Sequence, residues 1–598
     1  MSDKKMPIAQ ENEQEEKAGR WSLDALYKSL DSEAYKKDRS RALELVALYV
    51  ETSETKEGKE QVKAFLDIEE ELSSVLFKLF SYLALRSSVC TTDSEVLSEM
   101  ARLNRQLTDY KKAAVIFGQT VKALHEDPHK LAGELGFESY GYVLERVSEE
   151  SAHRLSPELE ELTAKLNLSG SDMWENLYET LTSTLKAEYR RKELTLSEVR
   201  NLASNADPAV RKAAYEAELA CYPKIRDSIA YCLNALKTQV KMLAQEREFA
   251  SPLDEACARS HMQRKTLDAL IGAMEDHFEI FRRYLRAKAT LLGDGNGLAW
   301  YNIEAPVGKI DASFDRDSAK AYLLKTFEPF NPRIAGVMRR AFEEEWIDFY
   351  PREGKVGGAF CYNLPFVGQS RVLTNFDGSF GAVDTLAHEL GHAFHGEMIK
   401  AHKPLNWDYS MPVAETASTF NETHLTMHAL ADAGSREAKL ALLESLLMNS
   451  TQTILDIYSR FTFESEVFER CDKEFLDADA LCDIMIRAQK KAFGDALNEM
   501  TLHPYMWLCK GHYYSASLSY YNWPYAFGSL LSMGLYNRVQ ANPAYMESYE
   551  KFLRNTTVMS VEDCGKSVGI DLGSRTFWEE GLAAFARLVD EYEELAQA

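Results

Sequence analysis

The chain has 598 residues and a mass of 67.8 kDa, and 45% of its residues are hydrophobic, so it is long and apolar enough to bury a large core. Its sparse glycine, proline and cysteine exclude a collagen, a mostly disordered chain and a small disulfide-stapled fold. The 93 acidic residues against 69 basic ones give a net charge of -24, which argues against general binding to nucleic acid or to anionic membranes.

The nine cysteines are scattered along the chain, and no two of them have the C-x-x-C spacing of a zinc clip or a redox pair. This usage is typical of reduced, mostly buried thiols. The N-terminus has no apolar segment of the kind that a signal peptide needs, and no stretch approaches the roughly 18 apolar residues of a membrane helix. We therefore expect a cytoplasmic protein without a membrane span.

Most of the chain has the hydrophobic pattern of α-helices. Residues 1–20 are polar and acidic and are expected to form a flexible tail. From Trp21 onward, apolar residues recur at intervals of three and four, which predicts a mainly helical body. The clearest predicted helices cover 62–88, 154–167, 209–243 and 440–459.

Several helix ends carry recognisable signals. Ser156 and Asp207 each precede a proline, which suits the first helical position. Thr576 with Glu579 has the spacing of a capping box, which predicts a last helix over 577–597. No internal repeat or long low-complexity linker is present in the sequence, so we expect the helices to build one body.

One region departs from this helical pattern. Residues 354–376 contain paired glycines, β-branched residues and alternating hydrophobicity, which predicts two short strands joined by a loop. The segment directly precedes a helix predicted over about 380–399, whose sequence includes HELGH at 388–392.

The HELGH helix has the features of a metal site. His388 and His392 lie four residues apart and differ in direction by about 40°, so both imidazoles can reach one cation. The histidines fall roughly opposite an apolar stripe, which is expected to pack on the core while they face a cavity. The stripe consists of Val383, Leu386, Ala387, Leu390 and Phe394. The alternative is a pair of satisfied surface histidines beside a solvated glutamate.

A catalytic zinc needs a third protein ligand and an open position for water. The next predicted helix, about 412–431, offers Glu415 and Glu422, which lie about 20° apart on one face. Glu415 suits the metal, and Glu422 suits the orientation of a ligand histidine. His424 and His428 lie on the other side of this helix and are expected to be packed or solvent-facing.

These residues predict metal-assisted hydrolysis. A zinc ion held by two histidines and a glutamate lowers the pKa of a water molecule toward about 7 and polarises a carbonyl oxygen. Glu389 cannot ligate together with both histidines, so we predict that it is the general base. It would take the proton of the water and return it to the leaving amine.

The tetrahedral oxyanion needs a further hydrogen-bond donor. The segment over 511–528, GHYYSASLSYYNWPYAFG, is denser in tyrosine than a core requires. We choose His512 and Tyr525 as the donors, with Tyr514 and Tyr521 as alternatives, and we expect Tyr514 to contact the substrate. A tyrosine-rich core with one buried histidine is the competing interpretation.

The sequence resembles the oligoendopeptidase F branch of the thimet oligopeptidase family of zinc metallopeptidases. The resemblance rests on HELGH at 388–392, AETASTFNE at 414–422, GAFC at 358–361 and the HYY to YYNWPYAFG run at 512–528, in the order of the family. It extends from about residue 110 to the C-terminus.

The resemblance implies a mainly α, elongated, zincin-type metallopeptidase with a small β-sheet beside a deep substrate channel. It implies a tail over 1–20, an N-terminal helical region over 21–205 and a catalytic domain over 206–598. One Zn²⁺ would be held by His388, His392 and Glu415.

The resemblance also implies roles in substrate binding. Short oligopeptides would be the substrates, and a peptide could add as a strand beside Gly357, Gly358 and Ala359. The spacing after His512 departs from the pattern of the family by one or two residues, which leaves the catalytic tyrosine open between Tyr525 and Tyr521.

Two other functions are open to such a chain. One is a peptide-binding protein that keeps the channel but performs no chemistry. The other is a carboxypeptidase or dipeptidyl carboxypeptidase, which needs a fixed donor for the terminal carboxylate of the substrate. Arg371 is a weak candidate for that donor, and a surface arginine is the simpler interpretation.

Overall fold

A computed structural model describes residues 19–597, so nearly all of the predicted tail over 1–20 lies outside the described residues. The N-terminal helices are α2 (Glu33–Thr55), α3 (Gly58–Val89), α4 (Ser94–Gln106), α5 (Thr108–Ala123), α6 (Pro128–Leu135), α7 (Gly141–Ala152), α8 (Pro157–Asn167) and α9 (Ser171–Thr184). They are followed by α10 (Leu196–Arg200), α11 (Pro208–Cys221), α12 (Arg226–Glu246), α13 (Pro252–Arg259), α14 (Arg264–Asp276), α15 (Phe278–Leu292), α16 (Arg316–Phe327) and α17 (Pro332–Glu343).

The C-terminal helices are α18 (Phe380–Ile399), α19 (Met411–Ala414), α20 (Thr416–Asp432), α21 (Arg436–Thr451), α22 (Ile457–Arg470), α23 (Ala478–Phe493), α24 (Trp523–Ala541), α25 (Met546–Asn555), α26 (Val561–Ser567) and α27 (Arg575–Gln597). The strands are β1 (Lys186–Tyr189), β2 (Lys192–Thr195), β3 (Ile347–Asp348), β4 (Phe360–Leu364) and β5 (Gln369–Leu373). The predicted mainly α fold with a small sheet is confirmed.

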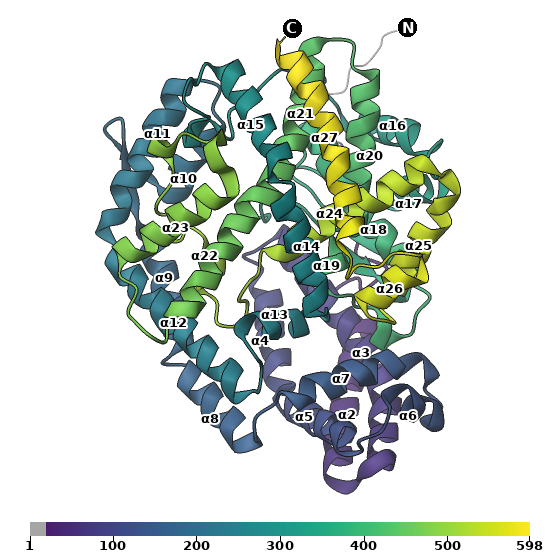
Figure 1. Cartoon of the computed structure of the whole chain (residues 1–598). Helices are drawn as coiled ribbons and strands as arrows, with labels where there is room; N and C mark the ends of the chain where they lie inside the picture. Colours follow the sequence, from purple (N-terminus) through teal and green to yellow (C-terminus); the bar gives the residue numbers. More distant parts are fainter. Residues whose placement is uncertain (1–18, 598) are drawn as a thin grey trace, which may run out of the picture.

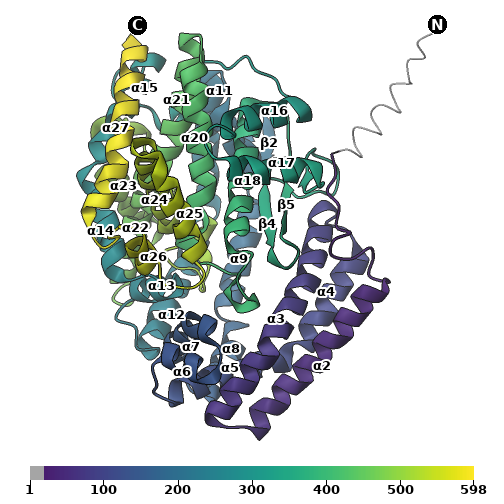
Figure 2. The ribbon, with the colours of Figure 1, turned by 90° about the vertical axis from the view of Figure 1, so that its right-hand side faces the viewer.

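Three large buried cores and one small one hold these helices together. Helices α2, α3 and α5 to α7 form an N-terminal bundle whose apolar core also contains Leu364 of β4 and Leu373 of β5, and α4 packs on α3 through a small cluster of Leu83, Val96 and Leu103. Figure 2 shows this bundle, in purple and blue, beneath the rest of the molecule. A second core joins α9, α11 and α12 to α22 and α23. The largest core contains α14 to α18, α20, α21 and α24 to α27, which extend from the centre to the right of Figure 1.

The predicted helix starts at two prolines are confirmed. The hydroxyl of Ser156 accepts a hydrogen bond from the Leu159 amide, and the carboxylate of Asp207 accepts one from the Ala209 amide. The predicted capping box at Thr576 is wrong, because α27 already begins at Arg575 and the Thr576 amide bonds to the Ser574 hydroxyl at 3.4 Å.

Two of the long predicted helices differ in detail from the structure. The helix predicted over 209–243 is interrupted between Cys221 and Arg226, because Pro223 has no amide hydrogen to continue the ladder. The helix predicted over 440–459 runs from α21 into α22 through a π-helical turn, Gln452–Asp456. Such turns occur frequently at functional sites.

The predicted strand pair over 354–376 is present as β4 and β5. They pair antiparallel with Phe360 opposite Leu373, and a single turn, Pro365–Val367, joins them. Strand β3 adds to β5 in parallel, which the sequence pattern does not indicate, and neither does it indicate the β1–β2 hairpin. The order β3-β5-β4 leaves β4 at an edge of the sheet, without a further strand partner in the described chain.

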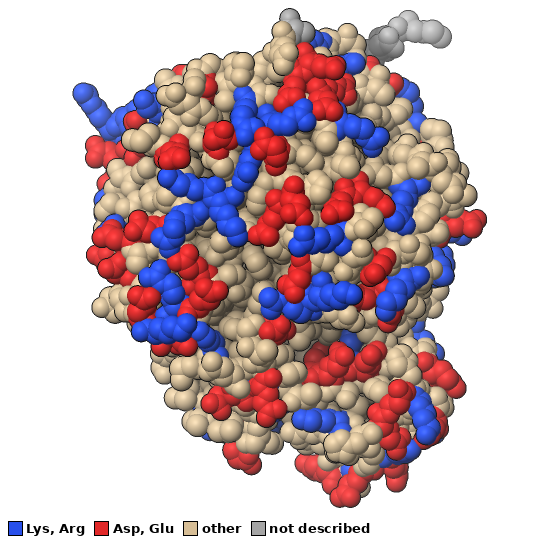
Figure 3. Space-filling model, in the orientation of Figure 1, with Lys and Arg blue, Asp and Glu red and all other residues tan. Residues whose placement is uncertain are grey.

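The surface is strongly charged. Figure 3 shows basic and acidic side chains interspersed on one face, with acidic side chains prevailing over the lower part, where the N-terminal bundle lies. Over residues 19–597, no helix combines the length and the apolar character needed to cross a bilayer.

Candidate metal centre

Helix α18 is held in place by its buried face. Ser379 caps its N-terminus by accepting a hydrogen bond from the Ala382 amide. The five residues of the predicted stripe are all 0% exposed and belong to the main core. The opposite face, with His388 and His392, is therefore fixed in orientation and only partly buried.

A glycine lets the next helix approach α18 closely. A Cβ atom on Gly391 would lie 2.4 Å from the carbonyl oxygen of Ala417 and 2.6 Å from the Cα of Ser418, both of them backbone atoms of α20. Only a residue without a side chain fits at this crossing. The contact places the start of α20 directly over the turn that carries the two histidines.

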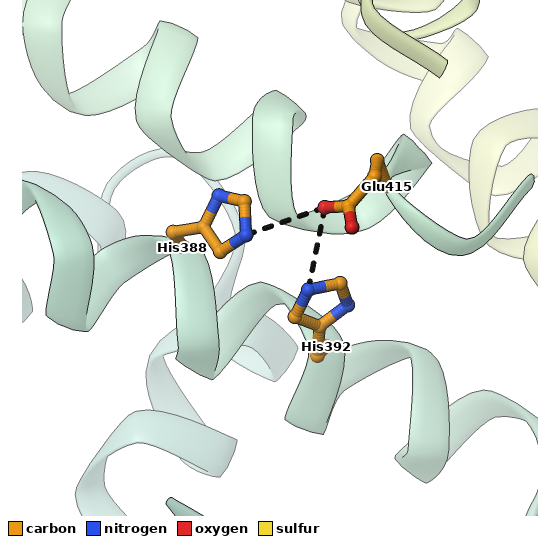
Figure 4. A group of neighbouring side chains, drawn as sticks. All are labelled: His388, His392 and Glu415. Carbon is orange, nitrogen blue, oxygen red and sulfur yellow. Dashed lines mark ion pairs between the residues drawn. The ribbon is translucent and has the colours of Figure 1, made fainter. Parts of the chain in front are cut away.

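Glu415 lies at the break between α19 and α20. Its backbone has φ -85° and ψ 2°, so the short helix Met411–Ala414 ends there and the side chain turns toward α18. One oxygen, Oε2, lies 3.3 Å from Nε2 of His388 and 3.4 Å from Nε2 of His392. Figure 4 shows both rings directing a nitrogen toward this oxygen. Ser418 donates a hydrogen bond of 2.8 Å to the same atom and fixes it.

These distances fit a bound metal ion. Ligand atoms about 2.0–2.2 Å from a tetrahedral zinc lie roughly 3.4 Å from one another. The donor atoms of His388, His392 and Glu415 all lie within 4.8 Å of one another. Two imidazole nitrogens and a carboxylate oxygen form one of the donor sets that hold zinc at catalytic sites. The residues present therefore fit the ion that the sequence predicted.

The charges of the site reinforce this arrangement. Burial opposes ionisation of Glu415, yet the hydrogen bonds with His388 and His392 hold its pKa far below the usual range. Burial likewise opposes protonation of His388, but contacts with Glu415 and Glu422 raise the pKa of its imidazole. The carboxylates around His388 therefore favour a positive charge at this point of the site.

Glu389 lies beside the two histidines with one oxygen unused. Its side chain is buried, at 5% exposure, and Oε2 has no hydrogen-bond partner within the described residues. Burial raises the pKa of this carboxyl, and the positive charges of His388 and His392 oppose the rise. A buried carboxylate with a free acceptor suits proton transfer to and from water.

Behind His388 lies a pair of carboxyl groups. Glu422 Oε1 is 3.3 Å from His388 Nδ1, where the sequence predicted an orienting contact. Sequence analysis missed Asp384, whose pKa is raised well above its usual value by burial and by the charge of Glu422. Asp384 precedes His388 by one helical turn, so the same periodicity could have identified it.

The segment over 511–528, here called the aromatic segment, brings three of the predicted residues together. The ring of His512 stacks on Tyr521 with 4.9 Å between ring centroids, and the hydroxyls of Tyr521 and Tyr525 are 2.8 Å apart. Partial burial and the cations Arg460 and Lys510 lower the pKa of His512 to about 4, so its imidazole is neutral at pH 7.

Tyr525 links the aromatic segment to the metal centre. Its side chain is 39% exposed, and burial, the contact with Tyr521 and the charge of Glu415 raise the pKa of its hydroxyl. Helix α24, which carries Tyr525, comes so close to this glutamate that a Cβ on Gly528 would lie 3.0 Å from Glu415 Cβ. The hydroxyl pair therefore belongs to the surroundings of the candidate metal site.

The remaining predicted residues lie elsewhere. Tyr514 is 3% exposed, donates to the Trp507 carbonyl and stacks on Tyr178 with 3.8 Å between centroids, so it belongs to a core and does not face the site. Gly357, Gly358 and Ala359 form a partly exposed loop just before β4.

Arg371 and His424 are both held inside the protein. Arg371 is 1% exposed and donates hydrogen bonds to the carbonyls of Ser22 and Ser370, so it is neither a surface residue nor available to a substrate. His424 stacks on Phe330 with 3.6 Å between centroids, as expected of a packed histidine.

A cavity of about 720 Å³ lies between the N-terminal bundle and the sheet. Cys361, Tyr362 and Asn363 of β4 line one side of it, and Tyr409 lies at the same side. Burial raises the pKa of the Cys361 thiol, and the charge of Glu389 adds to this shift. Burial also raises the pKa of the Tyr409 hydroxyl, and the charge of Glu415 contributes. The cavity therefore adjoins the metal centre along the edge strand.

Two family models match parts of the chain. Residues 325–584 match peptidase family M3, and residues 128–186 match the family described as Oligopeptidase F. Oligopeptidase PepF of Bacillus subtilis is 24% identical over 593 residues, which cover 96% of this chain and 87% of that relative. An oligoendopeptidase F homolog of Lactococcus lactis subsp. lactis is also 24% identical, with 96% of this chain and 97% of the relative covered.

Solved structures share the fold along nearly the whole chain. A protein of Chlamydophila abortus aligns with a TM-score of 0.83 and 19% identity, over 97% of this chain and 98% of the other. Oligoendopeptidase-F from Enterococcus faecium aligns with a TM-score of 0.65 and 18% identity, over 94% of this chain and 99% of the other. At these identities, the likeness concerns the fold.

Proposed function

Since the chain belongs to peptidase family M3, in its oligoendopeptidase F branch, we propose that it is a zinc-dependent endopeptidase that hydrolyses short oligopeptides. Membership of this family makes the protein a metalloendopeptidase. We propose in addition that the metal is zinc, that the substrates are short peptides and that the residues named below are the catalytic ones. The observation that carries it is the convergence of His388, His392 and Glu415 within 4.8 Å.

The proposed mechanism assigns separate tasks to the residues of the site. His388, His392 and Glu415 would hold one Zn²⁺, which supplies a Lewis acid that polarises the scissile carbonyl and lowers the pKa of a water molecule. The unused Oε2 atom of Glu389 takes the proton of that water and returns it to the leaving amine.

The aromatic segment supplies the donor for the oxyanion. Neutral His512 can donate one ring hydrogen, and the hydroxyl pair of Tyr521 and Tyr525 offers one hydrogen that is not used between the two oxygens. The proximity of Tyr525 to Glu415 supports Tyr525 as the donor and Tyr521 as the residue that orients it.

The substrate backbone is proposed to extend β4. This strand ends the sheet, and its residues Cys361 to Asn363 line the cavity beside Glu389. A peptide that pairs with a free strand edge gains main-chain hydrogen bonds with little regard to its sequence. Gly357, Gly358 and Ala359 would extend this edge, since no atom lies within 4 Å of a Cβ built on either glycine.

The proposed domain division follows the same evidence. The M3 match over 325–584 falls inside the region 206–598, which we propose as catalytic, and the Oligopeptidase F match over 128–186 falls inside 21–205. All nine cysteines are free thiols, which supports our proposal of a reducing, cytoplasmic location.

Metal analysis together with product mapping tests the proposed function. The purified protein should contain one zinc per chain and should cut internal bonds in a mixed peptide library, as shown by mass spectrometry of the products. Peptides blocked at both ends should be cut as well, whereas a carboxypeptidase would leave them intact.

A pair of glutamate variants tests the assignment of the ligands. Glu415→Ala should lose most of the bound zinc, because it removes one of three ligands. Glu422→Gln should lower zinc affinity only about 10- to 100-fold, because it changes a residue that orients His388. A Glu415→Ala protein that remains fully loaded with zinc would contradict the proposed ligand set.

A further inference from the structure

The wall of a second cavity includes Lys510, the residue directly before the aromatic segment. The cavity has a volume of about 380 Å³ and is lined by parts of α10, α11, α21 and the π-helical turn Gln452–Asp456. Polar and charged side chains contribute much of its wall, among them Arg200, Glu218, His503 and Lys510. A few polar groups that converge in a cavity can fix the orientation of a bound ligand.

Most of the charges around this cavity are paired. The guanidinium of Arg200 donates a hydrogen bond of 2.8 Å to Glu218. Arg460, which is 6% exposed, pairs with Asp456 of the π-helical turn and donates to the side chain of Asn522. These pairs leave the carboxylates of Glu218 and Asp456 already neutralised.

The exceptions are the exposed Glu304 and the partly buried Lys510. Among residues 19–597, nothing forms a hydrogen bond or an ion pair with the ammonium of Lys510. Burial and the neighbouring cations Arg460 and Arg200 lower the pKa of Lys510, against the opposing charge of Asp456. A partly buried ammonium beside two guanidinium groups is stabilised by an anion that enters the cavity.

A second polar group in the cavity, His503, has a partner for only one ring nitrogen, since its Nε2 atom lies 3.2 Å from Glu218 Oε1. His503 is 1% exposed, and its Nδ1 atom forms no hydrogen bond within the described chain. A buried ring nitrogen without a partner is costly unless a ligand or water satisfies it. The cavity thus offers one unpaired cation and one unsatisfied polar atom to the same occupant.

The cavity is adjacent to the proposed catalytic donors. Lys510 precedes His512 by two residues, and both Lys510 and Arg460 are close enough to lower the pKa of its imidazole. His512 in turn stacks on Tyr521, whose hydroxyl meets that of Tyr525. Lys510 is therefore close to the residues that we propose to meet the scissile bond.

We propose that Lys510 binds a carboxylate of the peptide substrate, and that this carboxylate is the free C-terminus. The enzyme would then favour peptides that end a few residues beyond the cleaved bond, which limits the substrates to short chains. This inference rests on the proposed function. An acidic side chain of the substrate carries the same chemistry, so the test separates the two sources.

The test measures the cleavage of one peptide, prepared in three forms, by the wild-type enzyme and by two variants of Lys510. The forms have a free C-terminal carboxylate, a C-terminal amide, or an amide with a glutamate near the C-terminus. With the wild-type enzyme, amidation should lower kcat/KM about 10- to 100-fold, as expected for loss of a charged hydrogen-bonded pair. In Lys510→Met, the free and amidated forms should be cut equally, at the low rate of the amide.

Two controls exclude indirect effects. Lys510→Arg should retain part of the preference for the free carboxylate, because the charge remains. Lys473→Met removes one positive charge from an exposed position outside the cavity and should leave the preference unchanged. Lys510→Met should be at least as resistant to denaturant as the wild type, since it removes a partly buried charge that has no protein partner.

The outcomes separate the inference from the function on which it rests. If the zinc-loaded wild type cuts free and amidated peptides equally well, the inference is wrong while the peptidase remains. If the glutamate form restores full kcat/KM and depends on Lys510, the site binds acidic side chains and the assignment to the C-terminus is wrong. If none of the three peptides is cut, the proposed function itself fails.

Discussion

The two sides of the candidate active site are built in different ways. The metal-binding side consists of two regular helices, α18 and α20, which are anchored by fully buried residues and cross closely at Gly391. The opposite side is the aromatic segment, which contains a single 3-10 turn, Gly511–Tyr514, before α24 begins at Trp523. Tyr525, at its end, is 39% exposed.

This difference separates two requirements of the reaction. Ligand atoms must remain within a few tenths of an ångström of their positions, and a close-packed helix pair provides that rigidity. Groups that contact the substrate must instead adapt to different peptide sequences, and an irregular, partly exposed segment permits this. Variants on each side should therefore fail in different ways.

The largest effect is expected on the metal-binding side. Glu389→Gln keeps the shape of the side chain but cannot accept a proton, so kcat should fall by about 10²–10⁴. The zinc content should not change, because residue 389 is not one of the proposed ligands. Steady-state kinetics together with metal analysis measure both quantities, and a variant with near-normal kcat would contradict the role of general base.

The same variant distinguishes an enzyme from a peptide-binding protein. Glu389→Gln should bind peptides with an affinity close to that of the zinc-loaded wild type. A protein that only binds peptides would show no turnover even before the change.

On the aromatic side, Tyr525→Phe should lower kcat by about 10²–10³, because it removes one hydrogen bond to the oxyanion. Tyr521→Phe should have a smaller effect, since its hydroxyl acts through Tyr525 at 2.8 Å. Tyr231→Phe, at an exposed position with its ring against Phe475, is the matched control and should leave the kinetics unchanged. The opposite order of the first two effects would identify Tyr521 as the donor.

The pattern of kinetic change is as informative as its size. A loss confined to KM in Tyr525→Phe would indicate that the hydroxyl binds substrate and transition state equally. Such a result would remove the aromatic segment from the chemical step and leave it as a binding surface.

The helix crossing can be tested by adding one methyl group. In Gly391→Ala, the new Cβ would overlap backbone atoms of α20, so the helices must separate at a cost of about 1–3 kcal/mol in unfolding free energy. Glu415 moves with α20, and zinc affinity should fall as well. Denaturant unfolding and zinc titration measure the two effects.

A second helical glycine provides the control for this variant. Gly336 lies inside α17, and no atom is found within 4 Å of a Cβ built there. Gly336→Ala should stabilise the protein by up to about 1 kcal/mol, because alanine favours the helix. Equal stability changes in the two variants would show that the crossing is not tight.

The same contrast explains how much could be predicted from the sequence. The structure brings His388, His392 and Glu422 close to one another, as helical periodicity indicates, because the period fixes the direction of a side chain once the buried face is known. The close approach at Gly391 could not be predicted, because it depends on which helix crosses α18.

The aromatic segment has no helical periodicity from which the directions of its side chains could be predicted. Tyr514 was expected at the substrate, yet its hydroxyl bonds to the Trp507 carbonyl inside a core. The β3 pairing and the role of Arg371 as a buried link to Ser22 also join residues that are distant in the chain. Contacts of this kind have no local sequence signal, since tertiary packing alone creates them.

The smallest effect concerns pH and two histidines that differ in burial. His395, on the buried face of α18, is 0% exposed and stacks on Tyr409, and burial lowers the pKa of its imidazole to about 3. The unfolded chain binds a proton at this residue near pH 6.5, whereas the folded chain does not. Its contribution to stability is therefore complete above pH 6.5 and is lost as the pH falls toward 3, at up to about 1.4 kcal/mol per pH unit.

Comparison with a variant isolates this contribution. His395→Gln should be less stable than the wild type at pH 7, and its unfolding free energy should decline less steeply between pH 6.5 and pH 5. His512→Gln should change the slope less, because His512 is partly exposed and its pKa is lowered only to about 4. If the His395→Gln and wild-type curves ran parallel, His395 would bind its proton equally in the folded and unfolded states, and the inner face of α18 would be less isolated from water than the contacts of His395 indicate.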